Sequence, residues 1–258
     1  MPVVALGFVL VLAHGLRAAR AANSGPVGAP VSRPGKPSGY GLVCSEEPAN
    51  RYLPRRSGCV TVYRAAIGSD KRAGLVVLYA NLSHRSVLHG RYYVPASWTL
   101  EMANTPRDIA RIRIEKGALD PFVLRIGNLN GLPGDEVIVQ PYDVSSGDPE
   151  TIYTLSSGTI HPAGTFSAGG DSLNQQRFSC RMRPTPEIVS DVGIAIANGS
   201  SIFKAVWKWT SVTYAWHGVT LIRASSRVFY RKGIRSIAPP TGAWGAGCGV
   251  LVGKARDE

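Results

Sequence analysis

The segment Ile109-Ala-Arg-Ile-Arg-Ile-Glu115 alternates apolar and charged side chains from Arg111 onward. Successive side chains of an extended strand point to opposite faces, so the isoleucines after Arg111 would share one face and the charged residues the other. A period of two residues is typical of a strand that has one buried and one solvated face. The segment therefore predicts β structure, with Arg111 and Arg113 on an exposed surface.

Comparable segments recur along the chain, separated by turns rich in glycine and proline. The 258 residues include 29 Gly and 18 Pro, and only 18% of them are charged. No helical period persists beyond a turn or two, and only residues 104–111 and 185–191 favour short helices. These features predict an all-β fold, an antiparallel β-sandwich or jelly roll with few short helices. The expected strands and sheet segments include Val60–Arg64, Gly74–Ala80, Phe122–Ile126, Val137–Val139, Ile152–Leu155, Ile202–Ile222 and Arg227–Arg231.

The N-terminal part predicts export and a simple domain organisation. Met1–Leu12 is almost wholly apolar but too short to span a bilayer, and small residues follow it as far as Ala22. This is typical of a signal peptide, here residues 1–22, cleaved after Ala21 or Ala22 to give a secreted, extracellular protein; the alternative is a buried N-terminal strand. Residues 23–43, with four Pro and five Gly, predict a flexible segment. Residues 44–258 would form a single β-sandwich domain.

The cysteines and sequons fit an exported chain. The four cysteines are Cys44, Cys59, Cys180 and Cys248. An even number in a secreted protein indicates two disulfides with three possible connectivities, of which Cys44–Cys59 with Cys180–Cys248 is favoured. No Cys-x-x-Cys spacing supports a zinc or redox site. Asn81 and Asn198 begin Asn-x-Ser sequons and are candidate glycosylation sites in a eukaryotic or viral host.

The charge balance suggests the chemistry of a partner. The formal net charge of the whole chain is +12. Removing Arg17 and Arg20 with the signal peptide leaves 27 Lys and Arg against 17 Asp and Glu, or +10. Such an excess favours an acidic protein or a polyanion, although it would also serve solubility alone. Export argues against nucleic acid as the partner, and no second apolar run is long enough to anchor the chain in a membrane.

We find no catalytic constellation in the sequence. The histidines show neither His-x-His nor His-Glu-x-x-His spacing, and the glycine-rich segments do not match a serine-nucleophile or phosphate-binding turn. No catalytic residue, metal ligand or cofactor site is therefore assigned. The alternative is a hydrolase with an unfamiliar site near His161 or His217, which would require a deep pocket that places one of them beside a carboxylate.

Aromatic and basic residues concentrate in the last part of the chain. Trp207 and Trp209 would share one face of a strand, either within the core or as part of a flat binding surface. Tryptophan, tyrosine and arginine often carry the binding energy of protein interfaces. The candidate basic, aromatic face consists of Arg111, Arg113, Trp207, Trp209, Arg223, Arg227 and Arg231.

These observations predict a non-enzymatic binding protein that is secreted as a monomer or homodimer. Its ligand would be an extracellular protein, as for a cytokine or chemokine decoy or another immune modulator, or a polyanion such as a glycosaminoglycan. Phe178-Ser-Cys180 does not extend to an immunoglobulin pattern, because the nearby tryptophans follow Cys180 instead of preceding it. The alternative function is structural, as a coat or envelope subunit; oligomeric state would separate the two.

Overall fold

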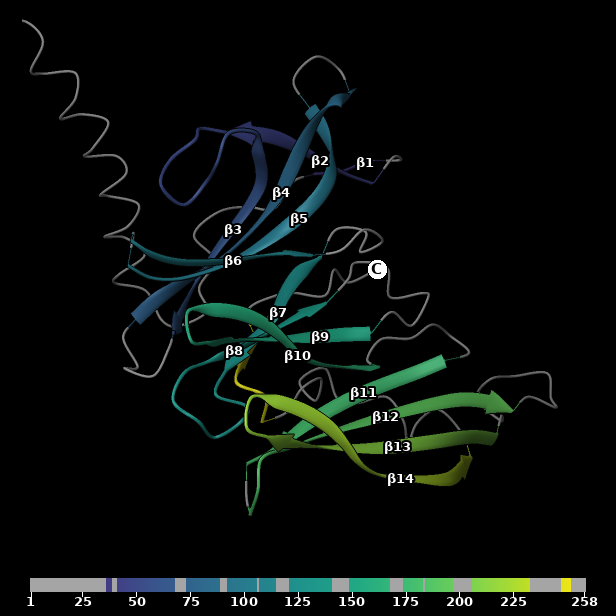
Figure 1. Ribbon diagram of the computed structural model, residues 1–258. Helices are drawn as coiled ribbons and strands as arrows, with labels where there is room; N and C mark the ends of the chain where they lie inside the picture. Colours follow the sequence, from purple (N-terminus) through teal and green to yellow (C-terminus); the bar gives the residue numbers. More distant parts are fainter. Residues whose placement is uncertain are drawn as a thin grey trace, which may run out of the picture.

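The described part of the protein is all-β and contains three antiparallel sheets (Figure 1). The computed structural model describes residues 36–38, 41–67, 73–88, 92–105, 107–114, 121–140, 149–167, 174–182, 184–196, 206–232 and 247–251. The predicted signal peptide lies outside these residues, as does most of the predicted flexible segment 23–43. The fold-class prediction is confirmed, and the sheets stack as a sandwich.

Most strands that follow one another in the chain are neighbours in a sheet. Because most connections join adjacent strands, the arrangement is a set of meanders. The first sheet has the order β1-β2-β3-β4-β5-β6, with Lys36–Ser38, Gly41–Glu47, Ser57–Ala66, Ala73–Leu88, Tyr92–Thr105 and Asp108–Ile114. The second has the order β10-β9-β8-β7-β15, with Thr159–Ser167, Pro149–Ser156, Glu136–Gln140, Phe122–Gly127 and Val250–Leu251. The third has the order β11-β12-β13-β14, with Asn174–Arg181, Glu187–Ile196, Val206–His217 and Thr220–Lys232. Within the sheets, the exceptions are β15, which pairs with β7, and a further pairing of β2 with β5.

The second sheet lies between the other two, so the sandwich has three layers. In β8, all five residues are buried. Val137 and Val139 belong to the hydrophobic cluster shared with the first sheet, whereas Ile138 belongs to the cluster shared with the third. The middle sheet therefore uses both of its faces for packing, as Figure 1 shows from the position of β7–β10 between β1–β6 and β11–β14.

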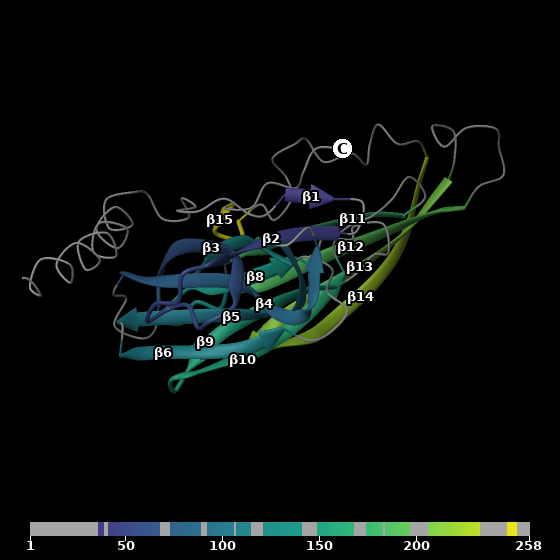
Figure 2. The same ribbon diagram turned by 90° about the horizontal axis from the view of Figure 1, so that it is seen from above.

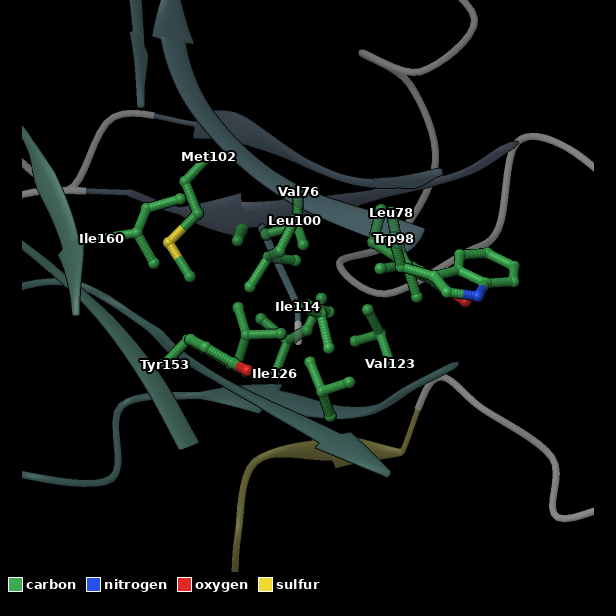
Figure 3. Packing of buried hydrophobic residues seen from close by; sticks show 14 of the residues in the cluster. Val76, Leu78, Trp98, Leu100, Met102, Ile114, Val123, Ile126, Tyr153 and Ile160 are labelled. Atoms are coloured by element: carbon green, nitrogen blue, oxygen red, sulfur yellow. The ribbon is translucent and has the colours of Figure 1, made fainter. Parts of the chain in front are cut away.

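The larger core fills the space between the first and second sheets. Figure 3 shows Met102 and Leu100 of β5 pointing toward Ile126 of β7 and Tyr153 of β9. Ile114 of β6 points into the same core, which confirms the alternation predicted for this strand. At about 25 cal/mol per Å² of apolar surface removed from water, a core of this kind is the main stabilising contribution to the fold.

The predicted short helices are wrong. Residues 104–111 contain the end of β5, the turn that follows and the start of β6, and residues 185–191 contain the start of β12. Their weak helical period is overridden because most of their residues pair with a neighbouring strand, β6 with β5 and β12 with β11 and β13. Among the described residues, none forms a helix that is long and apolar enough to cross a membrane.

Both favoured disulfides are present. Cys44–Cys59 closes the loop between β2 and β3. Cys180–Cys248 joins the end of β11 to the segment just before β15, and both of its cysteines lie in the core between the second and third sheets. The described chain has no free cysteine. Two disulfides are typical of proteins that fold in an oxidising compartment.

Candidate binding surface on the third sheet

The tryptophans of β13 are core residues. Trp207 is 0% and Trp209 is 2% exposed, and their ring centroids lie 6.4 Å apart. They form a small cluster with Ala195 of β12 and Phe229 of β14. Of the two interpretations of the sequence, the core interpretation therefore holds for these residues, and neither indole offers an exposed surface to a ligand.

Trp209 lies against the neighbouring strand because that strand has a glycine at this position. Gly193 is its register partner on β12, and a Cβ atom there would come within 2.6 Å of Cε2 of Trp209. Any other residue would displace the indole. On the other side, the Trp209 ring stacks on Phe229, with centroids 6.3 Å apart and planes inclined by 11°. The two aromatic rings thus form a flat base across β12–β14.

Three arginines lie over this aromatic base. The guanidinium carbon of Arg177, on β11, is 5.3 Å from the Trp209 ring centroid. Those of Arg227 and Arg231 are 5.6 and 5.4 Å from the centroid of Phe229. All three distances are within the range of cation–π attraction. We call this set the cationic face: Arg177, Trp209, Arg227, Phe229 and Arg231.

One carboxylate holds an arginine of the cationic face in position. Arg177 donates a hydrogen bond from Nε to Oδ2 of Asp191, its register partner on β12, at 2.8 Å. The Asp191 side chain is 14% exposed and the Arg177 side chain 33%. This ion pair fixes Arg177 over Trp209 while leaving part of the guanidinium accessible. Arg227 and Arg231 are exposed on the edge strand, so the face keeps an excess of positive charge.

The bulge in β14 separates Arg223 from the other two arginines of the strand. The register passes from Thr213 opposite Ser225 to Tyr214 opposite Arg223, so Ala224 is the extra residue. Arg223 therefore shares a face with Tyr214, on the side opposite Arg227 and Arg231. The expectation of one cluster containing all three arginines is corrected: the structure places two of them together.

Arg111 and Arg113 lie on β6 in the first sheet, and the second sheet separates them from the cationic face (Figure 1). The expected single basic face of β6 and β14 is therefore not formed.

Arg111 donates from Nε to Oε2 of the fully buried Glu101 at 2.7 Å. Burial raises the pKa of Glu101 to about 7, against the opposing effect of the Arg111 guanidinium. Arg111 thus pairs with a buried acid, whereas Arg113 is exposed.

The opposite face of the third sheet carries exposed apolar side chains beyond the region that packs on the second sheet. They surround the exposed Lys208 of β13. The register partners of Lys208 are Ile194 on β12 and Tyr230 on β14, so these side chains share one face of the sheet. Val228 and Tyr230 of β14 are 52% and 62% exposed. We call this set the apolar patch: Ile194, Ile196, Val228 and Tyr230. The outer part of the sheet is therefore cationic on one face and apolar on the other.

Two residues of the cationic face, Arg177 and Phe229, and the glycine beside it, Gly193, were not identified as candidates from the sequence. Phe229 has a visible signal, because the spacing Arg227-x-Phe229-x-Arg231 places all three side chains on one face of a strand. Arg177 and Gly193 have no comparable signal. Their roles depend on the register of β11 and β12 beside β13, which involves residues far apart in the chain.

A polar cleft of about 460 Å³ lies among the loops beside β6, β8 and β9, and its walls contain neither His161 nor His217. Its buried acid is Glu136, which accepts hydrogen bonds from the backbone N–H groups of Leu129 and Asn130 at 2.6 and 3.3 Å. Burial raises the pKa of Glu136 to about 7. These contacts hold the β7–β8 loop, and the described residues include no group of His, Cys, Asp and Glu placed to hold a metal ion.

The two sequons differ in what the structure describes. Asn81 is a half-buried residue of β4, and its Nδ2 donates to Oγ of Ser97 at 3.0 Å and to Oγ1 of Thr99 at 2.9 Å. A glycan on Nδ2 would replace at least one of these bonds, and glycosylation there stays a prediction. Asn198 lies outside the described residues.

The comparisons with known proteins do not extend this description. No family model, no curated protein and no solved structure matches the chain.

Proposed function

We propose that this chain is a secreted, non-enzymatic binding protein that engages an acidic region of an extracellular protein through the cationic face of its third sheet. The observation that carries the proposal is the placement of Arg177, Arg227 and Arg231 within 5.3–5.6 Å of two stacked aromatic rings. Export rests on the N-terminal signal pattern and is supported by the two disulfides.

The aromatic base prepares the arginines for binding. An arginine side chain normally loses considerable rotamer freedom when it is immobilised at an interface. Here the rings already restrict Arg227 and Arg231 through cation–π contacts, while the edges of their guanidinium groups remain able to donate to carboxylates. Trp209 is buried and Phe229 partly buried, so binding does not require the base to be rearranged. This favours specific recognition over a general effect of net charge.

A protein ligand fits the surface better than a linear polyanion. Glycosaminoglycan sites depend mainly on the density of positive charge, whereas Asp191 reduces the charge at one end of the cationic face. Arginine and aromatic residues are also enriched at protein interfaces. The alternative structural role is supported by the apolar patch, which would suit a second copy of the chain. The measured mass of the protein in solution distinguishes the two.

The direct test is to pass acidic, neutral and basic extracellular domains over the immobilised full-length secreted product in a biosensor. We expect the acidic ones to bind, and binding to weaken at high salt because exposed charges are screened. Arg227→Glu/Arg231→Glu should abolish binding. The matched control is Arg107→Glu/Arg113→Glu, which makes the same charge change at exposed residues beside and within β6.

Three results would contradict the proposal. The first is equal loss of binding in both double variants, which would indicate an effect of net charge alone. The second is binding to heparin without binding to any protein, which would point to a polyanion as the ligand. The third is recovery of the wild type only as a large symmetric assembly, as expected of a coat subunit.

A further inference from the structure

The edge of the third sheet is formed by β14, which has β13 as its only hydrogen-bonded neighbour among the described strands. Figure 2 shows β14 along the outer margin of the sheet. In an antiparallel sheet, half of the backbone N–H and C=O groups of an edge strand point away from its neighbour. Residues 222–228 are exposed throughout, so β14 presents these groups to solvent over several residues.

The side chains beside this edge alternate between two chemistries. On one side, Arg227 and Arg231 flank Phe229 in the cationic face. On the other side, Val228 and Tyr230 belong to the apolar patch. An added strand would pair its own alternate side chains with these two sets, because residues opposite one another in a sheet share a face.

We propose that β14 binds an extended segment of the acidic partner as a fifth strand of the third sheet, with acidic and apolar residues alternating in that segment. This inference rests on the proposed function and specifies its mode of recognition. The acidic side chains would contact Arg227 and Arg231, and the apolar ones would contact Val228 and Tyr230. Backbone hydrogen bonds would supply affinity and the alternation would supply specificity, as in other cases of β-strand addition.

Charge excludes a second copy of β14 as the occupant of the edge. Antiparallel self-pairing would bring the arginines of one β14 close to those of the other, and like charges in cross-strand positions are destabilising. The bulge at Ala224 also interrupts the regular edge, which limits pairing to the residues that follow it. Features that protect an edge strand from self-association therefore leave it open to an acidic strand of about six residues.

The experiment uses the full secreted chain and two synthetic peptides of identical composition. The probe is the labelled octapeptide Glu-Val-Glu-Val-Glu-Val-Glu-Val, and its control is Glu-Glu-Glu-Glu-Val-Val-Val-Val. Fluorescence anisotropy gives both affinities. Because only the alternating sequence can place acids and valines on opposite faces of a strand, we expect it to bind at least about tenfold more tightly.

A variant of the apolar patch tests strand addition independently of the arginines. Val228→Lys should weaken binding of the alternating peptide by about tenfold and leave the block peptide unaffected, because the added ammonium replaces an apolar cross-strand contact. The matched control is Val250→Lys, since Val250 is also an exposed strand valine, on β15. Hydrogen exchange of the wild type should show slower exchange in residues 225–231 when the alternating peptide binds, which needs no variant to fold.

The outcomes separate this inference from the proposed function. Equal affinity for the two peptides, or unchanged exchange along β14, would overturn strand addition. If Arg227→Gln/Arg231→Gln still weakened the binding of both peptides, the cationic face would remain the binding surface and only the mode of recognition would fail. Binding of neither peptide, together with unchanged binding of acidic domains by that variant, would overturn both.

Discussion

Strands β8 and β14 show two different uses of a β-strand in one molecule. β8 has a neighbouring strand on each side and a sheet against each face, and its five residues are all buried. β14 has one neighbouring strand, and most of its residues are exposed. Packing against the two neighbouring sheets accounts for Val137, Ile138 and Val139 of β8. It does not account for Arg227 and Arg231, which an aromatic base holds in place while they remain at the surface. The comparison indicates that the second sheet supports the fold and the third sheet carries the binding surface.

The largest effect expected from this comparison is on stability. Ile138→Ala in β8 should lower the free energy of unfolding by about 3 kcal/mol, because it leaves a cavity at a fully buried site. Val228→Ala in β14 removes an exposed side chain and should change the free energy of unfolding by less than about 0.5 kcal/mol. Urea denaturation with intact disulfides, followed by tryptophan fluorescence, measures both. Similar losses for the two variants would contradict the assignment of separate roles.

Buried acids make the stability of the fold depend on pH. Burial raises the pKa of Glu101 and of Glu136 from 4.5 to about 7. The folded protein therefore binds more protons than the unfolded chain between these values, and the stability that this contributes is lost as the pH rises from 4.5 through 7. One pKa unit corresponds to about 1.4 kcal/mol, so the loss is up to about 3 kcal/mol for each residue. Burial also raises the pKa of Glu150 well above its usual value, so this group contributes in the same direction.

Denaturation at a series of pH values tests this expectation. The wild type should lose stability between pH 5 and 7.5, and Glu101→Gln/Glu136→Gln should flatten this part of the profile because glutamine does not titrate. Asp108→Asn, at an exposed residue of β6, is the control and should leave the profile unchanged. A wild-type stability that increased over this range would contradict the interior environment described for the two acids.

The sequence predicts those parts of the fold that depend on local patterns. Alternation in β6 correctly predicted which of its side chains are buried, and cysteine spacing favoured the pairing that is found. The third layer could not be predicted, because a short buried run such as β8 looks the same whether one sheet or two cover it. The cationic face likewise requires Gly193 and Arg177 to lie beside Trp209, and this register is set by tertiary pairing.

A smaller effect is expected where the aromatic base contacts β12. Gly193→Ala places a methyl group within 2.6 Å of Cε2 of Trp209 and should cost about 1–3 kcal/mol through overpacking. The displaced indole should also weaken binding to acidic partners, because Arg177 lies over it. A double-mutant cycle with Trp209→Leu measures the coupling. Additive effects of the two substitutions would show that the glycine does not position the ring.

An effect on stability as small as that of Val228→Ala is expected at the arginines themselves. Arg227→Gln and Arg231→Gln should each change the free energy of unfolding by about 0.5 kcal/mol or less, because both side chains are exposed. The same substitutions should weaken binding to acidic partners by about tenfold, since a charge-assisted contact is lost at each. Arg55→Gln, in the exposed β2–β3 loop, is the matched control. A large loss of stability at Arg227 would indicate a structural role instead.

The most direct test of the central claim is to map the binding of the alternating acidic peptide on the isotopically labelled protein by NMR chemical shifts. We expect the changes to concentrate along β13 and β14, around Trp209, Arg227 and Arg231, with no change at Arg111 or Arg113. Changes centred on β6, or spread evenly over the basic surface, would contradict the assignment of the binding surface to the third sheet.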